Sequence, residues 1–163
     1  MIDALKERRS IRKYRDRCVE DEKIKKILTA GKMAPSGKNK KPWEFIVVED
    51  REIMRDLSRV KPKGGLFIED APIGIAVVGD EERSDTWVED CSIASTFMQL
   101  EAHNLGLGSC WVQIRGRFTA TKEDAEVKVR EILNIEERKR VLCIITVGYS
   151  DEVKPAYKEE DYC

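Results

Sequence analysis

A basic segment near the N-terminus, RRSIRKY, carries the strongest chemical signal in this 163-residue chain. Arg8, Ser10 and Arg12 alternate along it, so in an extended backbone their side chains point to one side. Two guanidinium groups and a hydroxyl on one side form an anion site, and a phosphate matches these donors best. The alternative is a solvated basic surface without a ligand, and the spacing alone does not separate the two.

A second polar segment, APSGKNKKPW, occupies residues 34–43. Its two prolines and its glycine predict a loop, and Ser36, Asn39 and Lys41 lie within that loop. Hydroxyl and amide groups presented in this way can meet the polar edge of a ligand. The alternative is a turn in which these side chains bond only to the local backbone.

The sequence contains no pattern typical of a histidine-based triad, a metal site or a dinucleotide-binding motif. His103 is the only histidine, and it lies one residue before the predicted end of a helix, where it should cap carbonyls or face solvent. With no second histidine, a histidine-based triad elsewhere is excluded, and we expect no metal site and no acid–base side chain. The GLG at residues 106–108 does not open a helix, so the dinucleotide-binding fingerprint is absent. A net charge of −1 argues against a general nucleic-acid binder.

The segment 85–111 predicts the helix around which the chain is organised. It is uncharged from Cys91 to Leu100, although 37% of all residues are charged. Apolar and small residues recur in it at three- and four-residue steps, and further apolar groups lie on other sides. Because a helix that is apolar nearly all round must be buried nearly all round, we expect a central helix that packs on a second copy of itself. An ordinary core helix is the alternative.

The remaining pattern predicts a single α+β domain over residues 1–163. Helices are expected over residues 2–9, from Asp21 to before Pro35, over 51–60 and over 121–133, with Asp21 and Thr121 as N-caps. Strands are expected over 43–48, 71–78, 109–114 and 140–147. The strand 71–78 is apolar on both faces and should be central. We therefore expect a small mixed or antiparallel sheet flanked by helices around the long central helix.

Cysteine usage and hydropathy bear on the compartment. The five cysteines are an odd number without a CxxC pair, and three of them lie in apolar runs, which indicates free thiols in a reducing environment. We expect no signal peptide and no membrane-spanning segment. These features predict a cytoplasmic protein.

Four segments, taken in order, resemble the nitroreductase-like family of FMN-dependent oxidoreductases. They are RRSIRKY, APSGKNKKPWEF, the uncharged helix leading to LGLGSCWV, and VGY after the last predicted strand. The resemblance implies an intertwined α+β homodimer with one FMN in each of two clefts between subunits. It also implies hydride transfer from NADH or NADPH to FMN, and then to a small acceptor such as a nitroaromatic or a quinone.

The resemblance also implies roles for individual residues. The N-terminal motif matches residues that bind the phosphate and ribityl oxygens of FMN, and the loop residues match a contact made from the partner subunit. The segment 111–114 matches a strand that backs the isoalloxazine, with a backbone N–H near its N5 atom. The expected cofactor-binding residues are Arg8, Arg9, Ser10, Arg12, Ser36, Asn39, Lys41, Trp111, Val112, Gln113, Ile114 and Lys158.

Two short segments bear on the acceptor. Segments 59–71 and 115–121 are shorter than family members commonly have, which leaves the substrate face of the flavin more open. Alternatives are a relative with a dedicated substrate, such as reductive dehalogenation or flavin breakdown, or one that uses a ferredoxin-type donor. A non-catalytic flavin- or nucleic-acid-binding protein is an alternative from another class.

Overall fold

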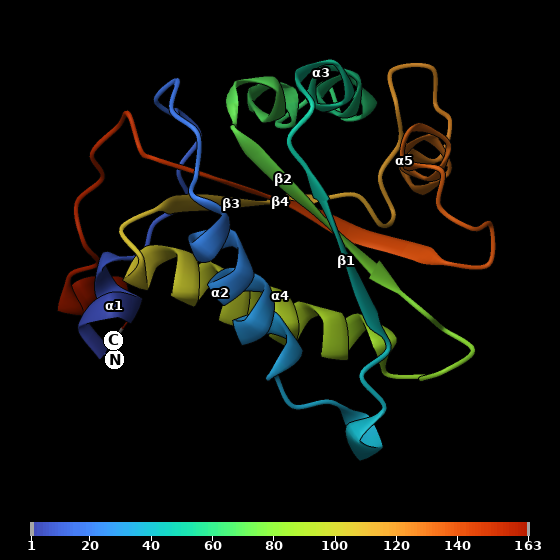
Figure 1. Ribbon diagram of the computed structural model, residues 1–163, viewed down its shortest axis with the longest axis horizontal. Coiled ribbons are helices and arrows are strands. Elements are labelled where there is room, and N and C mark those ends of the chain that lie inside the picture. The colour runs from blue at the N-terminus through green and yellow to red at the C-terminus, as the bar shows by residue number, and fades with distance from the viewer. Residues whose placement is uncertain (1, 163) are drawn as a thin grey trace.

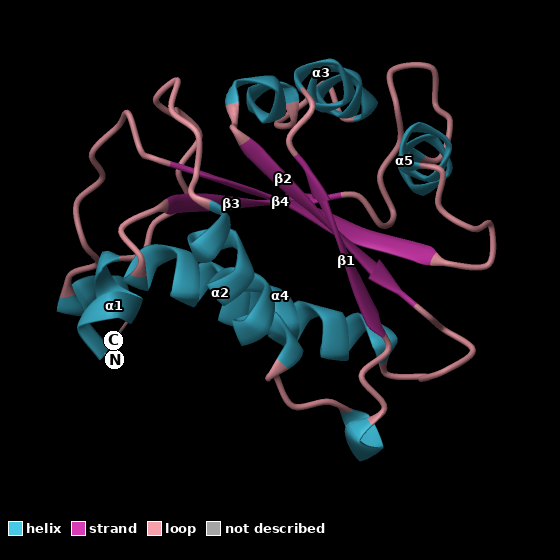
Figure 2. Ribbon diagram, viewed as in Figure 1, coloured by secondary structure: helices cyan, strands magenta, loops and turns pink. Residues whose placement is uncertain are grey.

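A four-stranded antiparallel sheet with helices on both faces forms the fold (Figures 1 and 2). The structure is a computed structural model and describes residues 2–162. The strands lie in the order β1-β2-β4-β3, and each neighbouring pair is antiparallel. Their bounds are Trp43–Val48 for β1, Ile73–Gly79 for β2, Gly108–Gln113 for β3 and Arg140–Gly148 for β4. The α+β prediction is confirmed, and the strand predicted to be central, β2, lies inside the sheet.

The helices form two layers, one on each face of the sheet. Their bounds are Ile2–Glu7 for α1, Asp21–Lys32 for α2, Arg51–Val60 for α3, Trp87–Asn104 for α4 and Ala125–Leu133 for α5. Short 3-10 turns lie at Gly37–Asn39 (η1), Leu66–Asp70 (η2) and Glu159–Asp161 (η3). Helices α2 and α4 cover one face, and α3 and α5 cover the other (Figure 1). Side chains of β2 alternate between the two cores, which explains its apolar composition.

Helix α4 is the predicted central helix, and one side of it is fully buried. Cys91, Ala94 and Met98 have no exposed surface, and they pack towards the sheet and α2. On the opposite side, 38% of Ile93 and 39% of Phe97 remain exposed. A single chain therefore buries α4 on one side, and an apolar strip remains on the other.

Two predicted helix caps are wrong. Helix α2 begins at Asp21 itself, and Glu20 occupies the N-cap position without a side-chain hydrogen bond. Helix α5 begins later than predicted, because the Asp124 carboxylate caps it by accepting the N–H of Glu126. Thr121 cannot open the helix, since the next residue, Lys122, adopts a left-handed backbone with φ of 65°.

A left-handed glycine follows the end of α4. Gly106 has φ of +76°, a left-handed conformation that glycine adopts without steric cost. This turn leads directly into β3. Within the described residues, no helix has the length and apolar composition needed to cross a membrane. Cys18, Cys91, Cys110 and Cys143 are free thiols, and Cys163 lies outside the described residues.

Glu126 ties α5 to the start of β4 and provides a test of this packing. Its side chain is 3% exposed and accepts hydrogen bonds from Arg140 Nε and Nη2, both at 3.0 Å, and from Val141 N–H at 3.1 Å. We expect Glu126→Ala to lower the free energy of unfolding by about 2–4 kcal/mol, because it leaves a buried N–H and a partly buried cation without their acceptor. Urea denaturation followed by circular dichroism measures this loss.

Lys128→Ala on the same helix is the control for Glu126→Ala. Its exposed ion pairs with Glu123 and Glu131 should contribute little, because water and salt screen them. Equal losses in the two variants would contradict the role assigned to Glu126.

Candidate functional site

The basic N-terminal segment runs beside the edge strand β3. Ser10 forms a parallel bridge with Ser109, and the N–H of Ile11 donates to the Ser109 carbonyl at 3.0 Å. This close approach needs a glycine in β3, since a Cβ on Gly108 would lie 2.8 Å from side-chain atoms of Ile11. The alternation read from the sequence is thus realised as extended backbone against the sheet.

The C-terminal tail holds this N-terminal segment in place. The Glu152 carboxylate accepts the backbone N–H of Arg12 at 2.6 Å and of Lys13 at 3.2 Å. The Lys154 ammonium donates to the Ser10 carbonyl and lies 3.5 Å from Glu152. The N–H of Arg12, with the nearby ammonium, holds the pKa of Glu152 below its ordinary value.

Arg9 makes a further contact between the segment and the tail. Its guanidinium donates to the Pro155 carbonyl and lies over the ring of Tyr157, 4.3 Å from the ring centroid. In this chain Arg9 therefore links the N-terminal segment to the tail.

Four cations lie near the buried thiol of Cys110, and a fifth, Arg117, lies near one of them, Lys61. Burial raises the pKa of Cys110, while nearby positive charges and a hydrogen bond from Ser10 oppose that rise. Burial lowers the pKa of Lys61, and two neighbouring guanidinium groups lower it further. We call this group the cation cluster; its members are Arg8, Arg12, Lys61, Arg117 and Lys154. Such a concentration of positive charge beside a hydroxyl fits the phosphate of a cofactor.

An open depression lies beside the cation cluster, where α4 ends and β3 begins. Its volume is about 290 Å³, and Arg8, Ser109 and Lys154 contribute to its walls. His103 also lines it and lies 3.7 Å from the Glu7 carboxylate. The depression gives an anion access to two members of the cation cluster.

The strand β3 offers backbone donors along its outer edge. Ser109 points its carbonyl outward to Ile11, so the alternation of a strand also turns the N–H groups of Trp111 and Gln113 outward. The side chains of Val112 and Ile114 are buried on the α3 and α5 side. The Trp111 indole N–H donates to Gln113 Oε1 at 2.9 Å, which orients both side chains.

The second predicted segment, the loop 36–41, lies at the far end of α4. The N–H of Gly37 donates to the Asp90 carboxylate at 2.8 Å, and the Ser36 hydroxyl accepts the N–H of Lys41 at 2.9 Å. The loop therefore contacts the first turn of α4, whereas the N-terminal segment lies beside the strand that follows its last turn (Figure 1).

The two halves of the predicted site are thus separated within one chain. Asp90 and Asn104 are fourteen residue steps apart along α4, which corresponds to about 20 Å at the rise of an α-helix. Ser36 and Asn39 cannot reach a ligand held beside Ser10 of the same chain across that distance. A site that uses both segments needs two chains.

Lys158 and Lys154 differ in their position relative to Ser10. The Lys158 side chain is 76% exposed and pairs with Glu160 at 3.5 Å, whereas the Lys154 ammonium contacts the Ser10 carbonyl. Sequence reasoning missed Lys154, Lys61 and Arg117. A signal was present in the basic loop KPKGG and in the lysine before Pro155.

A family model, a similar protein and a similar solved structure all match most of this chain. A model of the nitroreductase family matches residues 5–63 and 58–149. A protein of Methanothermobacter thermautotrophicus, named "Putative NADH dehydrogenase/NAD(P)H nitroreductase", is 41% identical over 155 residues, which cover 93% of this chain and 78% of that protein. The solved structure of an FMN-dependent nitroreductase from Clostridium difficile R20291 is 50% identical, with a TM-score of 0.96; the match covers 99% of this chain and 94% of that one.

Replacing Glu152 tests how the tail supports the N-terminal segment. In Glu152→Gln the amide oxygen can still accept, but the charge is lost, so we expect a loss of about 1 kcal/mol in unfolding free energy at pH 7. Because folding lowers the pKa of Glu152 below its ordinary 4.5, its contribution is complete above that pH and disappears as the pH falls through the folded-state pKa. Urea denaturation at pH 7 and in steps below pH 4.5 should therefore show the two proteins converging.

The exposed Glu49 provides the control for this pH dependence. Glu49→Gln should change the stability little throughout the same pH range. A Glu152→Gln deficit that persists unchanged at the lowest pH would show that the carboxylate charge does not hold the segment.

Proposed function

Since this chain belongs to the nitroreductase family, we propose that it passes reducing equivalents from NADH or NADPH, through FMN, to a small acceptor such as a nitroaromatic or a quinone. It is an oxidoreductase, and relatives named for NAD(P)H and FMN support both cofactors. The observation that carries the proposal is the cation cluster beside the outward N–H groups of β3.

Groups of this chain suit two polar parts of FMN, its phosphate and the edge of its flavin ring. Arg8, Arg12 and Lys154 would hold the phosphate, with the Ser10 hydroxyl as a further donor. The outward N–H groups of β3 would hold the edge of the flavin ring. When bound, FMN supplies the redox chemistry by accepting a hydride from the donor and returning it to the acceptor.

Positive charge is the second contribution of the protein. Fixed cations in a partly dry site stabilise negative charge that develops during reduction, and they do so without rearranging. Arg12 lies close enough to Lys61 for its charge to lower the pKa of Lys61, so both cations act on the same region of the site. No acid–base side chain is required of this arrangement.

The proposal includes a homodimer in which α4 of one chain packs against α4 of the other. The apolar strip at Ile93 and Phe97 is the surface that such packing would cover. An antiparallel pairing would bring the loop 36–41 of one chain to the cation cluster of its partner. The loop and the cation cluster, which are far apart within one chain, would then meet across the interface. An interface of this kind buries on the order of 2,000 Å².

The direct test is to examine the purified protein for bound flavin and for turnover. We expect a yellow protein with one FMN per chain, which oxidises NADH or NADPH when a nitroaromatic or a quinone is supplied. A colourless protein that fails to bind added FMN at micromolar concentration would refute the proposal.

Arg12→Ala should weaken FMN binding about tenfold or more, because a charge-assisted contact to phosphate contributes about 1.5–3 kcal/mol. Titration of the flavin-free protein with FMN, followed by flavin fluorescence, measures the Kd. Lys13→Ala is the matched control, since Lys13 is the next residue and is also exposed, but it is not in the cation cluster. Equal Kd values for wild type and Arg12→Ala would assign the phosphate to other residues.

Phe97→Glu should break the dimer, because it buries a carboxylate in the apolar strip without a partner. Val127→Glu is the control: Val127 is also 39% exposed, but it lies on α5. Sedimentation velocity at micromolar concentration should show a dimer for wild type and Val127→Glu, and a monomer for Phe97→Glu. A wild-type monomer would refute the proposed assembly.

A further inference from the structure

Asp90, in the first turn of α4, is a buried carboxylate that the redox chemistry does not use. The residue is only 3% exposed, and hydrogen bonds reach both of its carboxylate oxygens. Oδ1 accepts the N–H of Gly37 at 2.8 Å, and Oδ2 accepts the hydroxyls of Ser84 at 3.1 Å and Thr86 at 3.2 Å. A buried charge is costly unless donors surround it. Asp90 has three such donors, and one of them, the N–H of Gly37, belongs to the loop 36–41.

The loop that Asp90 holds has an unusual backbone. Lys38, Asn39 and Lys41 have φ values of 52°, 55° and 47°, in the left-handed region that residues with side chains rarely adopt. Such conformations persist where the surrounding structure enforces them, and they gather at ligand-binding loops. The loop also sits tightly on α4, since a Cβ on Gly37 would lie 2.6 Å from Thr86 Oγ1.

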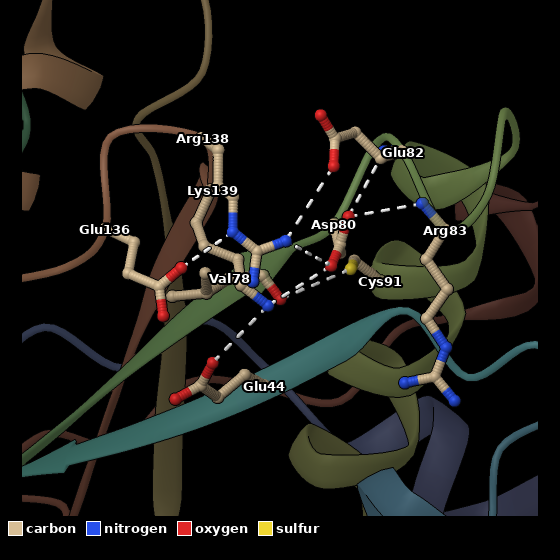
Figure 3. A network of polar contacts seen from close by, with 9 residues as sticks. All are labelled: Glu44, Val78, Asp80, Glu82, Arg83, Cys91, Glu136, Arg138 and Lys139. Carbon is tan, nitrogen blue, oxygen red and sulfur yellow. Dashed lines mark hydrogen bonds and ion pairs between the residues drawn. The ribbon is translucent and has the colours of Figure 1, made fainter.

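A second brace holds the other end of the same loop. The backbone N–H of Asp80 donates to the Pro42 carbonyl at 2.9 Å. The Asp80 carboxylate accepts the N–H groups of Glu82 and Arg83, both at 3.2 Å, and lies 3.3 Å from the Lys139 ammonium (Figure 3). The segment from Asp80 to Asp90 therefore holds the loop at two points, through the Asp80 N–H and the Asp90 carboxylate.

We infer that Asp90 is a positioning residue for the cofactor site of the opposite subunit. In each chain it fixes the backbone of the loop 36–41, which presents Ser36 and Asn39 to FMN held by the cation cluster of the partner. Asp90 itself touches no cofactor. This inference rests on the proposed function and on the antiparallel dimer.

The first experiment compares three variants by FMN titration and by thermal unfolding without FMN. Asp90→Ala should raise the Kd about tenfold, the effect of losing roughly 1.4 kcal/mol of binding. Asp90→Asn should restore the affinity, since its oxygen still accepts from Gly37 and its amide can donate to the Ser84 and Thr86 oxygens. Asp50→Ala removes a comparable carboxylate cap, which accepts two N–H groups at the start of α3, and should lower the Tm without changing the Kd.

These outcomes separate the inference from the function on which it rests. A wild-type protein that does not bind FMN refutes both. FMN binding that Arg12→Ala weakens but Asp90→Ala leaves unchanged refutes only the positioning role. An equal rise of Kd in Asp90→Ala and Asp50→Ala would show that general destabilisation, and not the loop, causes the effect.

The second experiment asks whether Asp90 acts across the interface. Chains carrying Asp90→Ala and Arg12→Ala are co-expressed with different affinity tags, and the mixed dimer is purified through both. If Asp90 serves the partner's site, both defects fall in one site, and the mixed dimer keeps one site of wild-type affinity. If Asp90 serves its own chain, each site carries one defect, and no site of wild-type affinity remains, which overturns the inference.

Gly37→Ala provides a second route to the same result if the buried Asp90→Ala chain folds poorly. Its added methyl group would meet Thr86 Oγ1 and displace the loop, while Asp90 keeps its other two donors. Paired with Arg12→Ala, it should give the same mixed dimer with one site of wild-type affinity. Two weakened sites in that dimer would also overturn the inference.

Discussion

The packing of α4 on the sheet is the constraint on which the rest of the molecule depends. Cys91, Ala94 and Met98 have no exposed surface, because the sheet and α2 close over them. This contact fixes the position of α4, which has polar groups near each of its ends. Asp90 and the loop 36–41 lie at its start, and the cation cluster lies beside the strand that follows its end.

Helix α4 carries both the exposed apolar strip and, near its two ends, the two polar halves of the predicted site. The apolar strip at Ile93 and Phe97 lacks a cover in the single chain, and the two polar halves are too far apart to share a ligand. Each of these two features, taken alone, is compatible with a monomer. Together they favour one arrangement, in which a second copy covers the strip and completes the site.

The sequence predicted those parts of the fold that local patterns determine. The observed bounds of β1 and α3 match the prediction, and α3 begins where the Asp50 side chain caps it. The cap of α5 was wrong because Thr121 and Asp124 both suit that position, and only the backbone of Lys122 decides between them. The alternation of Arg8, Ser10 and Arg12 indicated one shared side only if the segment were extended, and Ser10 does pair with β3 through Ser109. Lys154 was missed because it approaches Ser10 from 144 residues away, a contact that no local pattern reveals.

The free outer edge of β3 has a consequence for how the protein must be handled. An edge strand with outward N–H and carbonyl groups is a template on which another chain can add a strand, and such edges promote aggregation. Ser10 and Ile11 cover the beginning of β3, so the open part is the stretch around Trp111 and Gln113. A ligand lying along that stretch would cover these backbone groups and so reduce the tendency of this edge to pair with another chain.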